Sequence, residues 1–157
     1  MKAFPNKHIT SANIAEIELI YRSRVKPCER PKITTSSDAY KIFRSLWNDD
    51  TIGLYEQFRI LLLDRANRVL GQTLISSGGT AGTVVDPKLV FVAALKTKSA
   101  ALILAHNHPS GNLQPSEADL KITRQLKSAG SWMELPILDH LIITEDSYYS
   151  MADEGVL

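Results

Sequence analysis

The sequence is poor in cysteine, with one, Cys28, in 157 residues. A single thiol excludes an internal disulfide and any zinc finger built from several cysteines. The sequence also lacks a run of about 18 apolar residues, and its N-terminus lacks an apolar segment of signal-peptide length. We therefore expect neither a membrane-spanning helix nor a secretory leader, but a cytoplasmic protein without a membrane partner.

The sequence also lacks a strong excess of either charge, because its formal net charge is +1. Lys and Arg outnumber Asp and Glu by nine to six in residues 1–50 and by nine to five in residues 51–129. Residues 130–157 contain six acids and no Lys or Arg. Binding along a nucleic-acid backbone needs concentrated positive charge, so this pattern does not indicate general polyanion binding. A local basic face stays open as an alternative to solvated faces of mixed sign.

The chain is long enough, and with 44% hydrophobic residues apolar enough, to form one domain with a substantial core. Apolar spacing predicts a short helix over residues 14–21, followed by an extended, proline-containing connector over 25–37. Ser36 or Ser37 could cap a helix over 38–47. Two apolar runs, 56–64 and 69–76, predict a β-hairpin around a polar turn. We assign residues 1–32 to the N-terminal helix and connector, and residues 33–157 to the main domain.

The second half of the sequence alternates predicted helices and strands. After a glycine-rich loop at 77–82, Asp86-Pro87 predicts a helix start, and the apolar run 100–105 predicts a strand buried on both faces. Residues 116–129 predict a helix that stops at Gly130, and 137–144 and 147–150 predict two more strands. The order α, α, β, β, α, β, α, β, β predicts an α/β fold in which a mixed β-sheet is sandwiched by helices.

Residues 104–120, LAHNHPSGNLQPSEADL, contain two of the four histidines of the sequence. If 101–105 form a strand, His106 and His108 project from the same side at its end, because side chains alternate along a strand. Such a pair can chelate one cation, and Asp119, in the first turn of the next helix, is placed to be a third ligand. Two histidines and one carboxylate leave a fourth position open, which is typical of a catalytic zinc site. Water bound there becomes a usable nucleophile.

The same residues also have a purely structural interpretation. Ser116 followed three residues later by Asp119 is an ordinary helix start, and a His-x-His pair can occur by chance. The combination favours a site, because a buried strand, a Pro-Ser-Gly turn and a capped acidic helix follow one another closely. We therefore expect a metal site that shares its residues with a helix cap.

As a pattern, the stretch reads His-x-His, seven residues, Ser, two residues, Asp. It resembles the metal-binding half of the JAMM motif (MPN+, or JAB) of zinc-dependent isopeptidases. HNHPSG, PSEAD and ILDHLII resemble the RadC branch, historically labelled as DNA repair, from about Ile33 onward. The resemblance implies a JAB/MPN domain of cytidine-deaminase-like architecture over residues 33–157. Typical family members carry an additional N-terminal helix-hairpin-helix segment; this chain is too short for one, so we expect an isolated catalytic-type domain.

The resemblance also implies roles for the site residues. It makes His106, His108 and Asp119 the ligands of Zn²⁺, and it makes Ser116 the residue that helps to hold the water or the oxyanion. Glu56 matches the upstream glutamate that hydrogen-bonds the zinc water and acts as general acid and base. From the residues alone, Glu56 would be interpreted as an exposed glutamate at a strand start.

Three other features carry weaker expectations. Asp139 and His140 belong to the family pattern without being ligands, and on an alternating strand at most one of them points toward the site. For His140, both a role in orienting a metal ligand and an ordinary core position stay open. The loop containing Gly78 and Gly79 lacks the lysine of a P-loop, so we expect a flexible loop that lines a substrate groove. Trp47 and Trp132 are expected to be exposed and could serve an interface.

The leading hypothesis is a zinc metallohydrolase that cleaves a peptide or isopeptide bond in a protein or peptide substrate. The alternative is a DNA-associated module of repair or recombination in which zinc is structural or vestigial, although the near-neutral charge argues against tight DNA binding by this chain alone. A metal-dependent nuclease would use the same ligands, but two-metal phosphodiester cleavage usually needs an acidic cluster. The sequence names neither the substrate nor the oligomeric state.

Overall fold

The hairpin predicted over 56–76 forms the first two strands of the sheet. The computed structural model describes residues 20–79 and 82–157. Strands β1 (Gln57–Leu63) and β2 (Val69–Ser77) run antiparallel, and the turn between them contains Asn67 with a φ of 56°. On its other edge β1 pairs antiparallel with β3 (Ala101–Asn107), which sets Phe58 opposite His106. The hairpin therefore lies directly beside the strand that carries the first histidine.

The rest of the sheet contains a parallel pair. β4 (Ile137–Ile143) runs parallel to β3, and β5 (Tyr148–Ser150) runs antiparallel to β4. Within residues 20–79 and 82–157, the five strands form one mixed sheet in the order β2-β1-β3-β4-β5. Helix α3 (Glu117–Trp132) connects β3 to β4, as a parallel pair requires. The predicted α/β class with a mixed sheet is confirmed.

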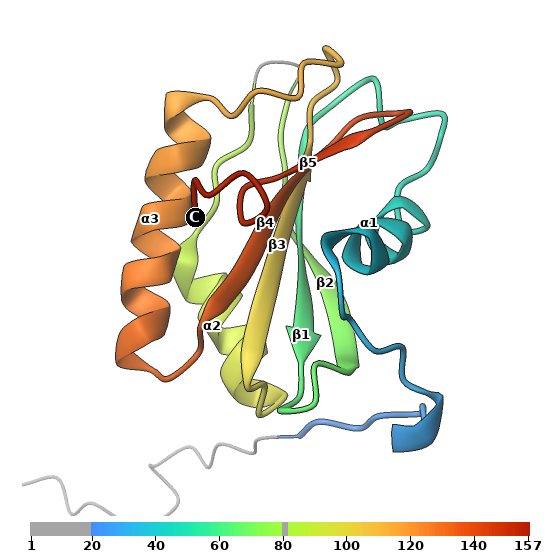
Figure 1. Ribbon diagram of the computed structural model, residues 1–157, viewed down its shortest axis with the longest axis vertical. Helices are drawn as coiled ribbons and strands as arrows, with labels where there is room; N and C mark the ends of the chain where they lie inside the picture. Colours follow the sequence, from blue (N-terminus) through green and yellow to red (C-terminus); the bar gives the residue numbers. More distant parts are fainter. Residues whose placement is uncertain (1–19, 80–81) are drawn as a thin grey trace, which may run out of the picture.

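Helices cover both faces of this sheet (Figure 1). Helix α1 (Ser36–Arg44) packs on one face, and α2 (Pro87–Lys96) and α3 pack on the other. Along β3 the buried side chains alternate, so that Ile103 and Ala105 join the core under α1 while Leu102 and Leu104 join the core under α2 and α3. Continued to the strand end, this alternation turns Asn107 toward α1 and His106 toward α2 and α3.

Reciprocal caps determine where two of the helices begin. Thr35, rather than either of the two serines after it, caps α1: its hydroxyl accepts from the N–H of Asp38, and the Asp38 carboxylate accepts from the N–H of Thr35. α3 begins after Ser116 with the same arrangement to Asp119. Each cap satisfies backbone N–H groups that have no partner within the helix.

α3 continues through Gly130 to Trp132, so the predicted stop at Gly130 is wrong. A Cβ atom at position 130 would collide with the carbonyl oxygen of Leu135. The N–H of Leu135 donates to the carbonyl of Gly130 at 2.9 Å, and the chain reverses at Glu134, whose φ is 53°. The glycine therefore permits the close packing of the following turn against the helix.

The two tryptophans differ in their surroundings. Trp132 is 88% exposed, but Trp47 is 5% exposed and packs near Phe43 in the core under α1. The prediction of an exposed Trp47 is wrong, because its indole N–H is drawn inward to the buried amide oxygen of Asn107.

The predicted N-terminal helix over 14–21 lies, except for its last two residues, outside the described residues. The connector that follows contains a short 3-10 helix at Pro27–Glu29, and α1 begins at Ser36, two residues earlier than predicted. Over the ranges 20–79 and 82–157, no helix has both the length and the apolar character needed to span a membrane.

Candidate metal centre

The carboxyl end of β3 presents two histidines on the same side of the sheet. His106 is 1% exposed and lies within β3, and the half-buried His108 follows the last residue of the strand. The N–H of His108 donates to the carbonyl of Ile143 at 2.9 Å, so the ladder with β4 continues past the strand end. The period of two is therefore kept, and the Nε2 atoms of the two rings lie 2.8 Å apart.

Asp119 reaches the same point from the first turn of α3. Its carboxylate oxygens lie 3.1 Å from Nε2 of His106 and 3.4 Å from Nε2 of His108. Ligand atoms of these three side chains all lie within 4.8 Å of one another, so the group could hold a metal ion. Two imidazole nitrogens and one carboxylate oxygen are a donor set found in catalytic zinc sites. The structure thus brings together the three residues that were expected as ligands.

The hydrogen-bonding capacity of this group fits a cation at its centre. Nδ1 of His108 lies 2.6 Å from the carbonyl oxygen of Asn112, which can only accept, so Nδ1 carries a hydrogen. A neutral His108 then directs the lone pair of Nε2 toward the carboxylate of Asp119, which is also an acceptor. Two acceptors facing each other need a proton or a metal ion between them.

The pKa values of the group also indicate a need for positive charge. Burial acts to raise the pKa of Asp119, but the rings of His106 and His108 hold it far below its usual range. Burial acts to lower the pKa of His108, but its interactions with Asp119 and Asn112 raise it above its usual value. The carboxylate of Asp119 and the ring of His108 thus favour each other's charged forms, and a metal ion would compete with a proton for Nε2 of His108.

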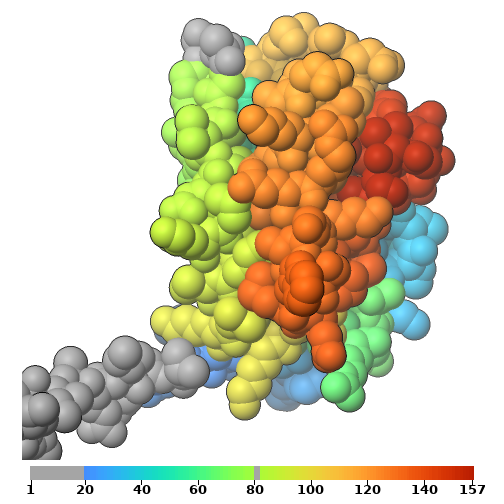
Figure 2. Space-filling view, turned by 90° about the vertical axis from the view of Figure 1, so that its left-hand side faces the viewer, coloured from blue at the N-terminus to red at the C-terminus, as the bar shows by residue number. Residues whose placement is uncertain are grey.

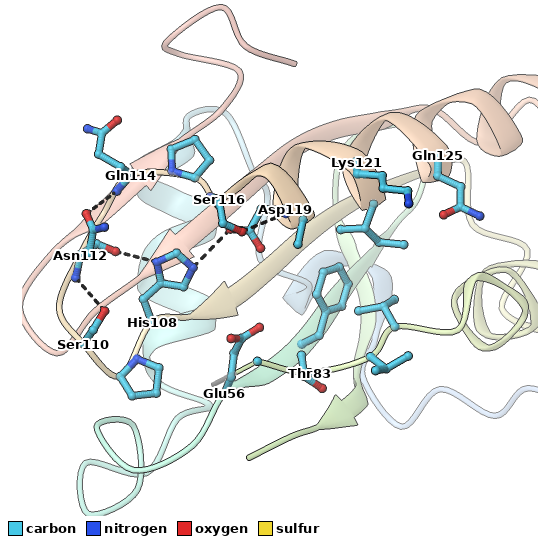
Figure 3. A pocket seen from close by; sticks show the side chains of 18 residues that line it. Glu56, Thr83, His108, Ser110, Asn112, Gln114, Ser116, Asp119, Lys121 and Gln125 are labelled. Atoms are coloured by element: carbon cyan, nitrogen blue, oxygen red, sulfur yellow. Dashed lines mark hydrogen bonds and ion pairs between the residues drawn. The ribbon is translucent and has the colours of Figure 1, made fainter. Parts of the chain in front are cut away.

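Ser116 touches the same carboxylate while it caps α3 (Figure 3). Its hydroxyl and its N–H donate to Oδ2 of Asp119 at 2.6 Å and 2.7 Å, and its Oγ accepts from the N–H of Asp119 at 3.2 Å. These bonds orient the carboxylate of Asp119, the candidate ligand. Because the hydroxyl hydrogen is directed at Asp119, Ser116 must turn this hydrogen away before it can donate to a reacting oxygen.

Glu56 approaches the group from the residue just before β1. The β1–β3 register pairs Phe58 with His106, and its continuation brings Glu56 beside His108. The Glu56 carboxylate points toward His108 and Asp119 (Figure 3). Burial raises its pKa, although the nearby histidines and the N–H of Thr83 act in the opposite direction. A raised pKa brings a glutamate closer to the neutral range, where a general base is most effective.

Glu56, His108, Ser116 and Asp119 line one cavity of about 640 Å³. Its other walls are the loop after β3, the first turns of α3 and residues 82–85, and Figure 2 shows the chain before α2 and α3 side by side on this face. The glycine-rich loop contributes Gly82 to the wall, while Thr80 and Ala81 lie outside the described residues. His106 is buried behind this wall.

Comparison with known proteins relates this site to a family. Residues 33–156, most of the chain, match the RadC-like JAB domain. The chain belongs to the RadC-like JAB domain family. The resemblance inferred from the His-x-His and Ser-x-x-Asp residues is therefore confirmed, and the match begins at the residue from which the resemblance was expected.

Relatives of this RadC-like JAB domain include proteins named UPF0758. A UPF0758 protein of Flavobacterium johnsoniae is 44% identical over 144 residues, which are 91% of this chain and 62% of that protein. A UPF0758 protein of Salinibacter ruber is 40% identical over 129 residues, 82% of this chain and 54% of that protein. The chain thus spans less than two thirds of the length of either relative.

In this RadC-like JAB domain, Asn107 forms a second polar centre on the opposite side of β3. Its amide oxygen accepts from the indole N–H of Trp47 at 3.0 Å and from the N–H of Gln57 at 2.7 Å. Its amide nitrogen donates to the carbonyls of Ile52 at 2.7 Å and Tyr55 at 2.9 Å. Asn107 therefore holds the loop that ends in Glu56. A polar residue within a buried strand was the only sequence signal for this role.

The neighbours Asp139 and His140 of β4 point to opposite sides, as strand alternation predicted. His140 is fully buried, and its Nε2 lies 2.8 Å from Nδ1 of His106. Asp139 accepts from the hydroxyl of Ser150 at 2.6 Å and from the N–H of Ala152 at 3.0 Å. Burial holds the pKa of His140 well below its usual value, so this ring is neutral. Of the two, His140 contacts a residue of the candidate metal centre, His106.

Proposed function

We propose that this chain is a zinc-dependent hydrolase of the JAMM type that cleaves a peptide or isopeptide bond. The observation that supports this proposal is the shared cavity: the ligands His108 and Asp119 line it together with Glu56. Structural zinc sites are usually closed by four protein ligands, whereas catalytic sites combine three protein ligands with an open position. The group of His106, His108 and Asp119 matches the second kind.

Zinc held by His106, His108 and Asp119 would supply Lewis acidity and a water of lowered pKa. Glu56 would take a proton from the attacking water and return it to the leaving amine, and its raised pKa suits both directions of transfer. Ser116 would redirect its hydroxyl hydrogen from Asp119 to the developing oxyanion, where a preorganised donor has its largest effect.

The lining of the cavity supports a peptide or protein as the substrate. Asn112, Gln114 and Gln125, which carry side-chain amides, are among the residues that line it. Amides both donate and accept, so they match the N–H and C=O groups of an extended peptide. Val84 and Val85 add apolar residues to the lining. We therefore expect a partner that presents backbone amides together with small apolar side chains.

The experiment compares three versions of the full chain: wild type, Glu56→Gln and His106→Ala. Wild type should contain zinc and cleave members of a quenched-fluorescence peptide and isopeptide library. Glu56→Gln should retain zinc and lose turnover, because the amide cannot accept the proton of the water. His106→Ala should lose both. Turnover retained by Glu56→Gln, or a wild type that binds zinc but cleaves no library member, would contradict the hydrolase proposal.

A DNA-associated module with structural or vestigial zinc predicts a different result. Among the residues that line the cavity, Lys121 is accompanied by Glu56 and Asp119, which disfavours a phosphate backbone at this place. Binding of DNA through phosphates should appear in a gel-shift titration and weaken steeply with added salt. Tight, salt-sensitive binding combined with no cleavage would favour this alternative.

A further inference from the structure

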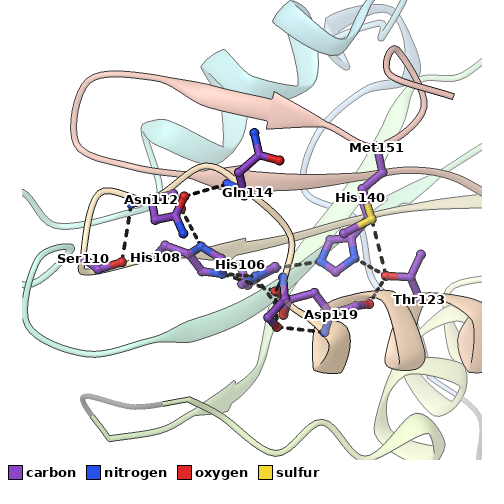
Figure 4. A network of polar contacts seen from close by, with 10 residues as sticks. His106, His108, Ser110, Asn112, Gln114, Asp119, Thr123, His140 and Met151 are labelled. Carbon is purple, nitrogen blue, oxygen red and sulfur yellow. Dashed lines mark hydrogen bonds and ion pairs between the residues drawn. The ribbon is translucent and has the colours of Figure 1, made fainter. Parts of the chain in front are cut away.

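A chain of buried polar side chains reaches His106 from behind, on the side away from the cavity (Figure 4). Nε2 of His140 lies 2.8 Å from Nδ1 of His106, and Nδ1 of His140 lies 2.6 Å from the hydroxyl oxygen of Thr123. The same hydroxyl oxygen lies 2.6 Å from the backbone carbonyl oxygen of Asp119. His140 and Thr123 are 0% and 4% exposed, so these groups satisfy one another rather than water.

The far end of this chain determines the direction of its hydrogen bonds. The carbonyl oxygen of Asp119 can only accept, and the hydroxyl of Thr123 has one hydrogen. The sulfur of Met151, 3.7 Å from the hydroxyl, is a weak competitor for that hydrogen. The Thr123 hydrogen therefore goes to the Asp119 carbonyl, as is common for a helical threonine and the residue four positions earlier. The Thr123 oxygen is then free to accept from Nδ1 of His140.

The remaining hydrogens follow one after another. With its hydrogen on Nδ1, a neutral His140 has an acceptor lone pair on Nε2. Nδ1 of His106 must then donate the bond of 2.8 Å between the two rings. A neutral His106 with its hydrogen on Nδ1 has its lone pair on Nε2, the atom that lies 3.1 Å from the Asp119 carboxylate.

We propose that Thr123 and His140 are positioning residues that hold His106 in the tautomer able to bind a metal. This inference rests on the metal site of the proposed function. The hydrogen-bond chain starts at the backbone of Asp119 and ends at the ring beside the Asp119 side chain, so one turn of α3 orients two ligands. Phe58 contributes by contacting the His140 ring edge-on, with ring centres 5.3 Å apart.

The substitution Thr123→Val keeps the size of the side chain and removes the hydroxyl. His140 then loses the acceptor for Nδ1–H and can carry its hydrogen on Nε2 instead. That hydrogen would be donated to Nδ1 of His106 and would leave the His106 hydrogen on Nε2, where it blocks the metal. We expect Thr123→Val to bind zinc about 10- to 100-fold more weakly than wild type in competition with a chromogenic chelator. Thr123→Ser keeps the hydroxyl and should recover most of the affinity.

Thr97→Val is a matched control. The Thr97 hydroxyl donates to the carbonyl of Ala93, also four residues earlier, at 2.9 Å, but Thr97 caps the C-terminal end of α2 and has Ser99 as its side-chain partner. Its removal should leave zinc affinity unchanged. Equal losses of affinity in Thr97→Val and Thr123→Val would assign the effect to helix stability and overturn the positioning role.

Histidine tautomers separate this inference from the proposed function. In the ¹⁵N-labelled, metal-free full chain, two-bond nitrogen–proton couplings should place the hydrogens of His106 and His140 on Nδ1, and Thr123→Val should move them to Nε2. A wild-type His106 with its hydrogen on Nε2 overturns the inference, whether or not zinc binds. A wild type with the expected tautomers that binds no zinc supports the hydrogen-bond chain and contradicts the proposed function.

Discussion

The two sides of the carboxyl end of β3 are built from adjacent residues and have opposite hydrogen-bonding character. Toward α1, the amide of Asn107 has four partners, and both its oxygen and its nitrogen are satisfied. Toward α2 and α3, His108 and Asp119 turn acceptors toward each other at 3.4 Å. The Asn107 side is complete without a ligand, whereas the histidine side is complete only with a proton or a metal ion.

This difference shows how one strand can separate rigidity from chemistry. Because side chains alternate along β3, Asn107 can hold the loop that carries Glu56 without entering the cavity. His106 and His108, on the other side, remain available to a ligand. A site held by satisfied, buried partners keeps its geometry when the ligand arrives. Substitutions on the histidine side should therefore change zinc affinity, whereas substitutions on the Asn107 side should change the stability of the fold.

The largest effect is expected from removing a ligand on the histidine side. In His108→Ala, one of three proposed ligands is lost. Zinc affinity should therefore fall by more than about 100-fold, which is the upper range for the loss of a residue that only hydrogen-bonds a ligand. Since His108 is half-buried at the strand end, the unfolding free energy of the metal-free protein should change by about 1 kcal/mol at most. Isothermal titration with zinc and urea denaturation measure the two quantities. A large loss of stability with unchanged zinc affinity would reverse the assignment of this side.

The next largest effect is expected on the Asn107 side, where substitution should change stability and not zinc affinity. Asn107→Ala removes two buried and two partly buried hydrogen bonds, and each buried group left without a partner costs about 1–3 kcal/mol, so the unfolding free energy should fall by about 3 kcal/mol or more. Zinc affinity should change by less than about tenfold, which is the lower range for the loss of a residue that hydrogen-bonds a ligand. The same two measurements test this expectation.

Trp47→Phe is the milder control for that substitution. It removes one of the four bonds and leaves the Asn107 oxygen bonded to the N–H of Gln57, so the loss should be about 1 kcal/mol. If Asn107→Ala cost no more than Trp47→Phe, the amide would not be the centre that holds this loop.

The smallest effect is a pH dependence confined to the histidine side. The pKa of His108 is raised above 6.5, so protons compete with zinc for this ring at pH values at which an ordinary histidine is already neutral. Below the raised pKa, zinc affinity should fall about tenfold per pH unit. The metal-free protein should show the opposite sign. Because the pKa of His108 is higher in the folded than in the unfolded state, protonation of His108 stabilises the fold. This stabilisation is fully present below pH 6.5, the pKa of an unfolded histidine, and is lost as the pH rises through the pKa of the folded state.

Melting curves with and without a chelator, recorded from below pH 6.5 to above the raised pKa of His108, test both pH dependences. The melting temperature of the chelated protein should decrease as the pH rises, while that of the zinc-saturated protein should increase. His108→Ala should remove both trends. Identical trends with and without chelator would show that His108 is not the group through which proton and metal compete.

The strands and helices around the site could be predicted because their signals are local. The apolar run before His106 and the Ser-x-x-Asp start of α3 lie within a few residues of what they determine. The errors concern a cap that lies one residue earlier than expected, at Thr35, and two contacts that the local pattern does not show. Gly130 meets the turn at Leu135 rather than ending the helix, and Trp47 is buried by its bond to Asn107, 60 residues away.

The sequence by itself determined that His106 and His108 share a side and that Asp119 stands in a capped first turn, because strand period and helix capping depend on near neighbours. Only the tertiary structure decided what surrounds them. The β1–β3 register brings Glu56 beside His108, and the parallel pairing of β3 with β4 brings His140 to His106 across 34 residues of sequence. Such partners depend on which strands pair and in which register, and these long-range choices are made by the packing of the whole sheet.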